Sequence, residues 1–235
     1  SDLRSVFKNI FKLLNDGGHL CFEVGYFLKV LQNNLFDTIY HEHLDYHHAA
    51  PLVQLLRSQG FSIISLTENK VQGGSLRVLC RKDNLKKISY SANLFLQKES
   101  KFFKKNKIKI NKWKNTIENS MNKFEEIIKK YYMKKYVISA YGAPTKATLL
   151  LKLANLSSHK YLNYIVEDNK LKIGRHIPCT KIKIVDFKYF RENKPNILIV
   201  LAWNFIDDIK AQLIKKKVKG ILILVPLPKI RKILI

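Results

Sequence analysis

The sequence predicts an α/β protein in two parts that are joined by a helical span. Short runs rich in Ile, Val and Leu alternate with longer segments whose apolar residues recur at helical spacing. In the second half the order strand, turn, helix is repeated, which implies a parallel sheet with right-handed crossovers. A long basic stretch with a seven-residue apolar repeat separates the two halves.

The first part shows alternating helix and strand signals. An amphipathic helix comes first and is ended by Asp16 and two glycines, and a later helix has Pro51 in its first turn and Gly60 at its end. The elements expected here are a helix at 2–16, a strand at 20–24, an undecided segment at 25–34, a helix at 50–58, and strands at 61–66 and 75–80.

Residues 82–135 form the most basic region. Its apolar residues recur every seven positions, which predicts one long amphipathic helix, or two helices with a break near Asn106. We interpret the apolar stripe as core that packs on a flanking sheet, and the lysines as a solvated face. A coiled coil with another chain is the weaker interpretation, because Asn106 and Ser120 interrupt the second seam position.

The second part is expected to form a parallel α/β unit from residue 136 to the end. The expected strands are 137–141, 164–167, 197–203 and 221–225, and the expected helices are 147–156 and 206–216. Between the first strand and the first helix lies the turn Gly142–Lys146. A small-residue turn that leads to a helix N-terminus with a lysine is a plausible phosphate seat, although it fits neither the Walker nor the GxGxxG pattern.

The composition of the chain indicates which class of molecule it could bind. The net charge of +25 would suit a polyanion, but the lysines are spread singly and arginine, the favoured base-reading residue, is rare. We therefore rank nucleic acid below a phosphorylated small molecule. The longest apolar run, 221–227, is too short to span a bilayer, and three distant cysteines without CxxC spacing indicate a reducing compartment with no disulfide frame and no structural zinc. These features predict a cytoplasmic protein.

The segment FDTIYHEHLDY, residues 36–46, carries the strongest chemical signal. Four of the seven histidines fall in or directly after it, between a strand and a helix, where α/β enzymes place their chemistry. Three interpretations remain open. The His-x-His pair could ligate a metal, the imidazoles could be satisfied by backbone groups, or a histidine beside a carboxylate could transfer a proton near neutral pH. We favour proton transfer and predict no metal.

A glycine pair before the last strand of the first part is the second signal. In Gln72-Gly73-Gly74-Ser75 the pair predicts either a tight turn or close approach by a ligand, with Arg77 nearby.

Together these stretches resemble the class I S-adenosylmethionine-dependent sugar C-methyltransferases. FDTIYHEHLDY followed by VQGGSLRV is similar to that family, as are the later stretches YGAPTK, VEDN, LAWN and PLP. The resemblance implies that residues 1–82 are the C-terminal half of the methyltransferase sheet and domain. It implies further that residues 83–135 are a basic helical connector, and residues 136–235 a Rossmann-like C-methyltransferase domain. Gln72 replaces the usual His, and Ala147-Thr148 replaces the usual Gly-Asn.

The resemblance also assigns roles. It implies that His43 is the catalytic base, Glu42 its partner and Tyr40 a hydroxyl that orients the substrate. The remaining expected substrate contacts are Tyr46, Gly73, Gly74, Arg77, Lys146 and Asn204. The implied reaction is methylation of the carbon beside the keto group of a nucleotide-linked ketosugar, with S-adenosylmethionine as donor.

The main donor-binding motif is absent from this sequence. No E-x-G-x-G turn and no set of four zinc-binding cysteines is present, so we expect the donor to be bound by a preceding segment or a separate N-terminal polypeptide. The alternatives are a non-catalytic remnant, a nucleotide-sugar-binding subunit and, more distantly, a basic nucleic-acid-binding protein.

Overall fold

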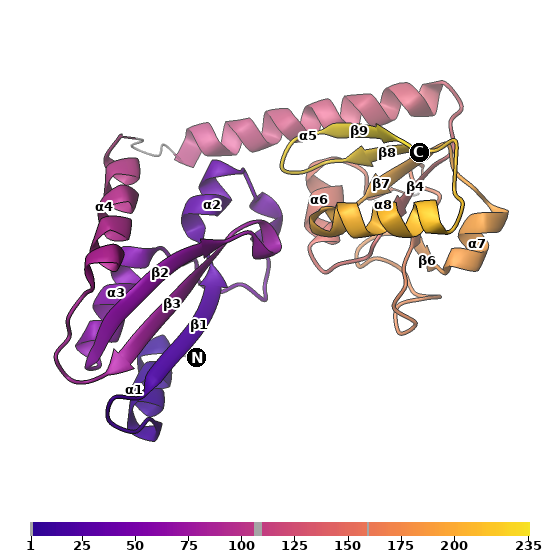
Figure 1. Cartoon of the computed structure of the whole chain (residues 1–235). Helices are drawn as coiled ribbons and strands as arrows, with labels where there is room; N and C mark the ends of the chain where they lie inside the picture. Colours follow the sequence, from indigo (N-terminus) through magenta and orange to yellow (C-terminus); the bar gives the residue numbers. More distant parts are fainter. Residues whose placement is uncertain (1, 106–109, 159) are drawn as a thin grey trace. The chain divides into compact units, whose positions relative to one another are not determined.

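The computed structural model describes residues 2–105, 110–158 and 160–235, and the chain divides into two compact units (Figure 1). The first unit comprises residues 1–34 and 43–110, and the second comprises residues 35–42 and 111–235. The start of the histidine segment therefore belongs to the second unit, and its end belongs to the first. The predicted α/β class is confirmed.

The first unit is built on a three-stranded antiparallel sheet. Its strands are β1 (His19–Gly25), β2 (Phe61–Asn69) and β3 (Ser75–Lys82), in the order β1-β3-β2. Both partners run opposite to β3, and the pairing with β2 shifts register between Ile63 and Ser65. All of the pairing in this sheet is therefore antiparallel.

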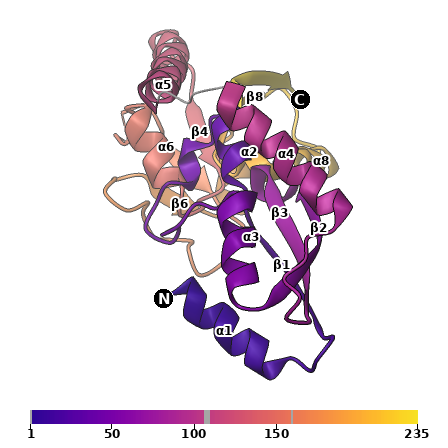
Figure 2. The ribbon, with the colours of Figure 1, turned by 90° about the vertical axis from the view of Figure 1, so that its left-hand side faces the viewer.

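Four helices accompany this sheet. They are α1 (Leu3–Leu13), α2 (Phe27–Gln32), α3 (Ala49–Ser58) and α4 (Tyr90–Lys105). Asp2 caps α1 by accepting a hydrogen bond from the backbone N–H of Arg4. Helices α3 and α4 both contact β2, and Figure 2 shows them beside the sheet. The apolar faces of the helices and alternate residues of β3 form one core, which includes Phe7, Leu52, Leu56, Phe61, Ile63, Leu76, Val78 and Cys80.

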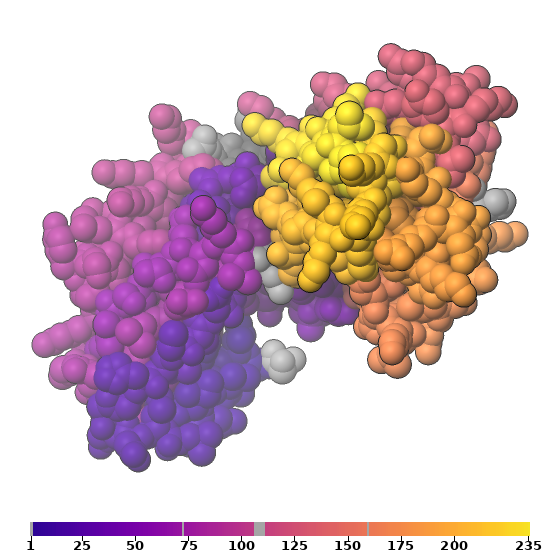
Figure 3. Space-filling model, turned by 45° about the vertical axis from the view of Figure 1, so that its right-hand side comes forward, coloured from indigo at the N-terminus to yellow at the C-terminus, as the bar shows by residue number. Residues whose placement is uncertain are grey.

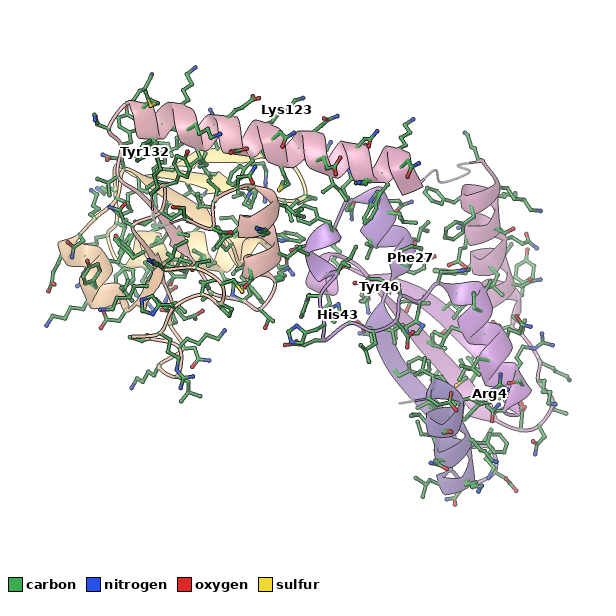
Figure 4. All side chains as sticks on the ribbon, turned by 180° about the vertical axis from the view of Figure 1, so that it is seen from behind. Arg4, Phe27, His43, Tyr46, Lys123 and Tyr132 are labelled. Atoms are coloured by element: carbon green, nitrogen blue, oxygen red, sulfur yellow. The ribbon has the colours of Figure 1, made fainter. Side chains whose placement is uncertain are left out.

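The basic helical span is divided between the two units. Helix α4 belongs to the first, and α5 (Ile110–Met133) belongs almost wholly to the second. The expected break at Asn106 lies outside the described residues. The predicted apolar stripe of α5 is buried at Ile117, Met121, Phe124 and Ile128, whereas the lysines of α5, such as Lys123 in Figure 4, are exposed. The interpretation of the stripe as core is confirmed for this helix.

The second unit contains a six-stranded sheet in the order β6-β5-β4-β7-β8-β9. Its first five strands in this order are parallel, and β9 is antiparallel to β8. The strands are β4 (Ile138–Tyr141), β5 (Tyr164–Val166), β6 (Lys183–Val185), β7 (Ile197–Val200), β8 (Leu222–Val225) and β9 (Arg231–Leu234). The helices α6 (Ala147–Leu153), α7 (Phe187–Glu192) and α8 (Ile206–Lys215) complete the unit. The predicted Rossmann-like parallel sheet is confirmed, and Figure 3 shows the C-terminal strand at the surface.

Several elements differ from the expectation. The undecided segment at 25–34 contains the short helix α2, and the strand expected at 197–203 ends at Val200. Residues Trp203–Phe205 instead form a 3-10 turn, η3. Strand β6 has three residues and α7 six, so neither is long enough to show a period in the sequence. Among the described residues no helix is both long and apolar enough to cross a membrane.

Candidate functional site

The histidine segment is a surface loop between α2 and α3. Its first turn is the 3-10 helix η1 (Phe36–Thr38), and His41, Glu42 and His43 follow as exposed residues. Toward the end of the loop the backbone N–H of Phe27 donates to the carbonyl of His47 at 2.8 Å, and the rings of Phe27 and Tyr46 lie 5.9 Å apart. Figure 4 shows Tyr46 beside Phe27, with His43 farther along the loop.

A buried carboxylate holds the end of the loop in the first unit. The side chain of Glu99 is 1% exposed. Its oxygens accept hydrogen bonds from the backbone N–H groups of Ala49 and Ala50 at 2.8 and 3.0 Å, and from the hydroxyl of Tyr26 at 2.7 Å. The Nδ1 atom of His48 lies 3.1 Å from the same carboxylate. Glu99 thus satisfies the first backbone donors of α3, which have no partner within the helix.

The environment of Glu99 has two further features. Burial, together with the hydrogen bond to Glu99, raises the pKa of Tyr26, so this tyrosine stays a neutral donor throughout the physiological range. A surface hollow of about 450 Å³ adjoins the carboxylate and is lined by His48, Ala50, Glu99, Ser100, Phe103 and Lys104. The ring of His48 lies 5.0 Å from that of Phe103. His48 is therefore placed by a carboxylate on one side and an aromatic ring on the other.

A second buried carboxylate holds the beginning of the loop in the second unit. Asp37 is 0% exposed, and its Oδ2 accepts hydrogen bonds from the Trp203 indole N–H at 2.6 Å and from the Lys146 ammonium at 2.9 Å. Lys146 also donates to Oδ1 of Asn204 at 3.0 Å and lies 4.6 Å from the centre of the Trp203 ring. The predicted residues Lys146 and Asn204 are thus brought together, around a carboxylate that the sequence analysis did not select.

Two acidic residues that follow β5, Glu167 and Asp168, hold the end of β4 and the turn after it. An oxygen of Glu167 accepts the backbone N–H of Ala143 at 2.8 Å, and Lys172 donates to the carbonyl of Ala143 at 2.8 Å. The Tyr141 hydroxyl donates to Asp168 at 2.7 Å, and burial raises the pKa of Tyr141. The predicted phosphate seat is therefore bordered by carboxylates, which would repel a phosphate.

The predicted glycine turn has a clear packing role. Gly74 has φ +136°, and a Cβ there would lie 2.5 Å from the side chain of Lys29. Its carbonyl accepts the backbone N–H of Tyr26 at 3.2 Å, so the turn packs on the start of α2. Gly73 also has a positive φ, of 90°. Whether the pair contacts a ligand as well stays a prediction.

Arg77 lies in a cross-strand cluster on β1 and β3. Its guanidinium contacts Oε2 of Glu23 at 3.0 and 3.1 Å, and Asn69 donates to the same oxygen at 2.9 Å. The hydroxyl of Ser75 donates to the other oxygen of Glu23. These bonds, that of Ser75 foremost, lower the pKa of Glu23. About half of the Arg77 side chain remains exposed, so it could still meet an anion.

Three side chains at these anchors escaped selection from the sequence. Asp37 lies within the histidine segment, but its partner Trp203 is 166 positions away, so sequence spacing does not connect them. Trp203 was assigned to a strand, although it begins η3. Glu99 follows Ala92 by seven residues, and both are buried on α4. The sequence signal that could have identified Glu99 is a carboxylate on the apolar face of a predicted helix.

The glycine turn of the second unit, at Gly142, is closely packed and does not have the E-x-G-x-G pattern. A Cβ at Gly142 would meet that of Ala202 at 2.6 Å, and Asp37, Lys146 and Trp203 bond to one another in the same unit. No group of three or more His, Cys, Asp or Glu side chains within the described ranges has the geometry of a metal site. What the described residues provide is the exposed run His41, Glu42 and His43, which in sequence follows Asp37, a buried anchor of the second unit, and precedes the loop end that Glu99 holds in the first unit.

Comparison with known proteins identifies the family of the chain. Residues 70–228 match the family model of the C-methyltransferase C-terminal domain. The chain therefore belongs to the C-methyltransferase family. It is also 26% identical over 209 residues to the C-methyltransferase NovU of Streptomyces niveus, a match that covers 88% of this chain and 50% of that protein. The chain thus spans about half the length of the curated relative. A match over 88% of the chain includes residues 36–46 wherever it begins.

Proposed function

We propose that this chain takes part in methylation of the carbon beside the keto group of a nucleotide-linked ketosugar, with S-adenosylmethionine as the methyl source. The observation that carries the proposal is the exposed run His41, Glu42 and His43, which closely follows the buried carboxylate of Asp37 in a member of the C-methyltransferase family. The base that acts on the substrate would come from this segment.

His43 is the proposed catalytic base. A carbon-bound hydrogen beside a carbonyl is acidified, yet it still needs a positioned base for removal at neutral pH. An imidazole nitrogen of His43 would take the proton while the electron pair of the C–H bond moves toward the carbonyl oxygen, which gives an enolate. The carboxylate of Glu42 would offset the charge of the imidazolium. The hydroxyl of Tyr40 would hold the sugar in place.

Four other predicted residues, all in the first unit, remain substrate contacts in this proposal. Arg77 and Tyr46 present polar groups at the surface of the first unit, and Gly73 and Gly74 would allow backbone approach. No donor step is assigned to the described residues. A second candidate function is a subunit that binds the nucleotide-sugar without turnover, and the half-exposed guanidinium of Arg77, which could meet an anion, favours it.

Proton removal can be tested without the methyl donor. The chain is incubated in D2O with a nucleoside-diphosphate-linked 4-ketosugar, and proton NMR follows loss of the signal at the carbon beside the keto group. We expect exchange that is faster with the chain than without it, and at least about 100-fold slower in His43→Gln, in line with the usual contribution of a general base.

The control is His19→Gln on β1, an exposed histidine of the same unit outside the loop, which should exchange at the wild-type rate. Wild-type exchange in His43→Gln would contradict the assignment of the base. Saturable binding of the ketosugar without any exchange would replace the proposal with the non-catalytic binding subunit.

A further inference from the structure

The strand order of the second unit contains a switch point, and doubly wound folds bind nucleotides in the crevice beyond the strand ends at such a point. The strand order changes direction between β4 and β7, and in open parallel sheets ligands bind outside the carboxyl ends of the strands at such a point. The loops that border it here are Gly142–Lys146 after β4 and 201–204 after β7. They approach closely, since the N–H of Leu201 donates to the carbonyl of Tyr141 at 2.9 Å.

The chain fills this crevice with its own residues. Leu35, Phe36 and Asp37 are 1%, 3% and 0% exposed, and η1 contacts α6, the helix that follows the β4 turn. The carboxylate of Asp37 occupies the place between the two loops and bonds to one residue of each, Lys146 and Trp203. The carboxylate of Asp37 thus already occupies the position where an anionic ligand would bind.

Lys146 has little capacity left for a phosphate. Its side chain is 15% exposed, its charge is compensated by Asp37 at 2.9 Å, and another of its hydrogens goes to Asn204 at 3.0 Å. The Trp203 ring lies below the ammonium at 4.6 Å. Since buried charge pairs are costly to separate, the arrangement favours a lasting contact within the protein over an exchangeable ligand.

We propose that Asp37 is a positioning residue, which fastens the chain just before Tyr40–His43 into the switch-point crevice of the second unit through Lys146 and Trp203. Lys146 and Asn204 then serve the reaction through Asp37 and not by contact with the substrate. The consequence for catalysis rests on the proposed function of His43, but the fastening itself does not.

Hydrogen–deuterium exchange of the chain alone tests the fastening. The N–H groups of Ile39 and Tyr40 donate to the carbonyls of Phe36 and Thr38 at 2.9 and 3.1 Å, so they report on the turn that Asp37 holds. We expect Asp37→Ala to speed exchange of these two amides at least about tenfold, because it removes two charge-assisted hydrogen bonds. Amides of β4 and β7 should stay as protected as in the wild type.

Lys146→Met is a second test variant, in which methionine replaces lysine with a side chain of similar length. It keeps the apolar stem over Trp203 and removes the charge, and should produce a smaller change in the same direction. Glu125→Gln is the matched control, because it breaks an ion pair of 2.7 Å between Glu125 and Lys129 on α5 in the same unit, and it should leave the two amides unchanged.

The outcomes separate this inference from the proposed function. Unchanged exchange of the two amides in both folded variants would overturn the fastening. If Asp37→Ala does not fold, Asp37→Asn and Lys146→Met take its place, and unchanged exchange in both would be equally decisive. In the ketosugar assay, Asp37→Asn should lower kcat about tenfold or more and leave KM unchanged, whereas a substrate-contact role of this cluster would raise KM. Loosened amides together with wild-type ketosugar exchange in His43→Gln would retain the fastening and refute the base.

Discussion

Asp37 and Glu99 are the acidic residues that the described part of the chain buries almost completely, with side chains that are 0% and 1% exposed. Burial removes water from each carboxylate, and charged or polar hydrogen-bond donors offset that cost. The donors to Glu99 lie at the start of α3, and the donors to Asp37 lie beyond the strand ends of the second unit. One oxygen of Asp37, Oδ1, has no partner among the described residues. A carboxylate held by one oxygen keeps a defined orientation and an unused acceptor.

Replacement of Glu99 should destabilise the first unit. Glu99→Ala would leave the buried N–H group of Ala49 and the buried hydroxyl of Tyr26 without their acceptor, and would remove the part-buried bond from the N–H group of Ala50. We expect a loss of about 3–5 kcal/mol in the free energy of unfolding, measured by urea denaturation with far-UV circular dichroism.

The matched control for this prediction is Glu68→Gln. Glu68 forms an exposed ion pair with Lys29 at 2.7 Å, and its loss should cost less than about 1 kcal/mol. Equal effects of the two substitutions would show that the Glu99 contacts contribute no more than a surface pair.

At the scale of elements, the sequence predicted helices and strands correctly where the element was long enough for its apolar pattern to repeat. The apolar repeats located α1, α3 and α5, and the Ile- and Val-rich runs located β2, β3, β4 and β8. Where an element is only a few residues long, tertiary contacts decide it, so α2, β6 and α7 were undecided or missed. Strand β9 was missed as well, because its mixed sequence Arg231–Leu234 pairs only with β8.

The candidate site was predictable as a segment but not as a set of contacts. The histidine cluster and the position of Lys146 and Asn204 at strand ends could be read from local sequence. The pairing of Asp37 with Lys146 and Trp203 depends on the topology of the parallel sheet, which brings distant strand ends to one edge. The burial of Glu99 likewise depends on which face of α4 meets the first unit.

The glycine turn before β3 gives a prediction at this scale. Gly74→Ala places a Cβ 2.5 Å from Lys29 at a φ of +136°, and both the contact and the backbone conformation are unfavourable. We expect the free energy of unfolding to fall by about 1–3 kcal/mol, measured by thermal and urea denaturation. Gly25→Ala, whose added Cβ would meet nothing within 4 Å, should change it by less than about 1 kcal/mol. If the two variants were equally stable, the close approach to Lys29 would have no energetic weight.

For the whole molecule, the family match extends from residue 70 to residue 228 and so includes residues of both units. The histidine segment precedes that range, but it lies inside the match to the relative. The five lysines of α5 are all exposed, which fits the interpretation of the lysines of this span as a solvated face. A basic surface of this kind also favours encounter with an anionic nucleotide-sugar, to an extent that falls with ionic strength.

The central claim, that the imidazole of residue 43 removes a proton from the substrate, is tested most directly by chemical rescue. His43→Ala is incubated in D2O with the ketosugar, and NMR follows exchange at the carbon beside the keto group as imidazole is added. The account predicts that exchange is lost in His43→Ala and returns in proportion to the imidazole concentration, because the free base fills the space that the exposed side chain has vacated. Exchange at the wild-type rate in His43→Ala without imidazole would contradict it.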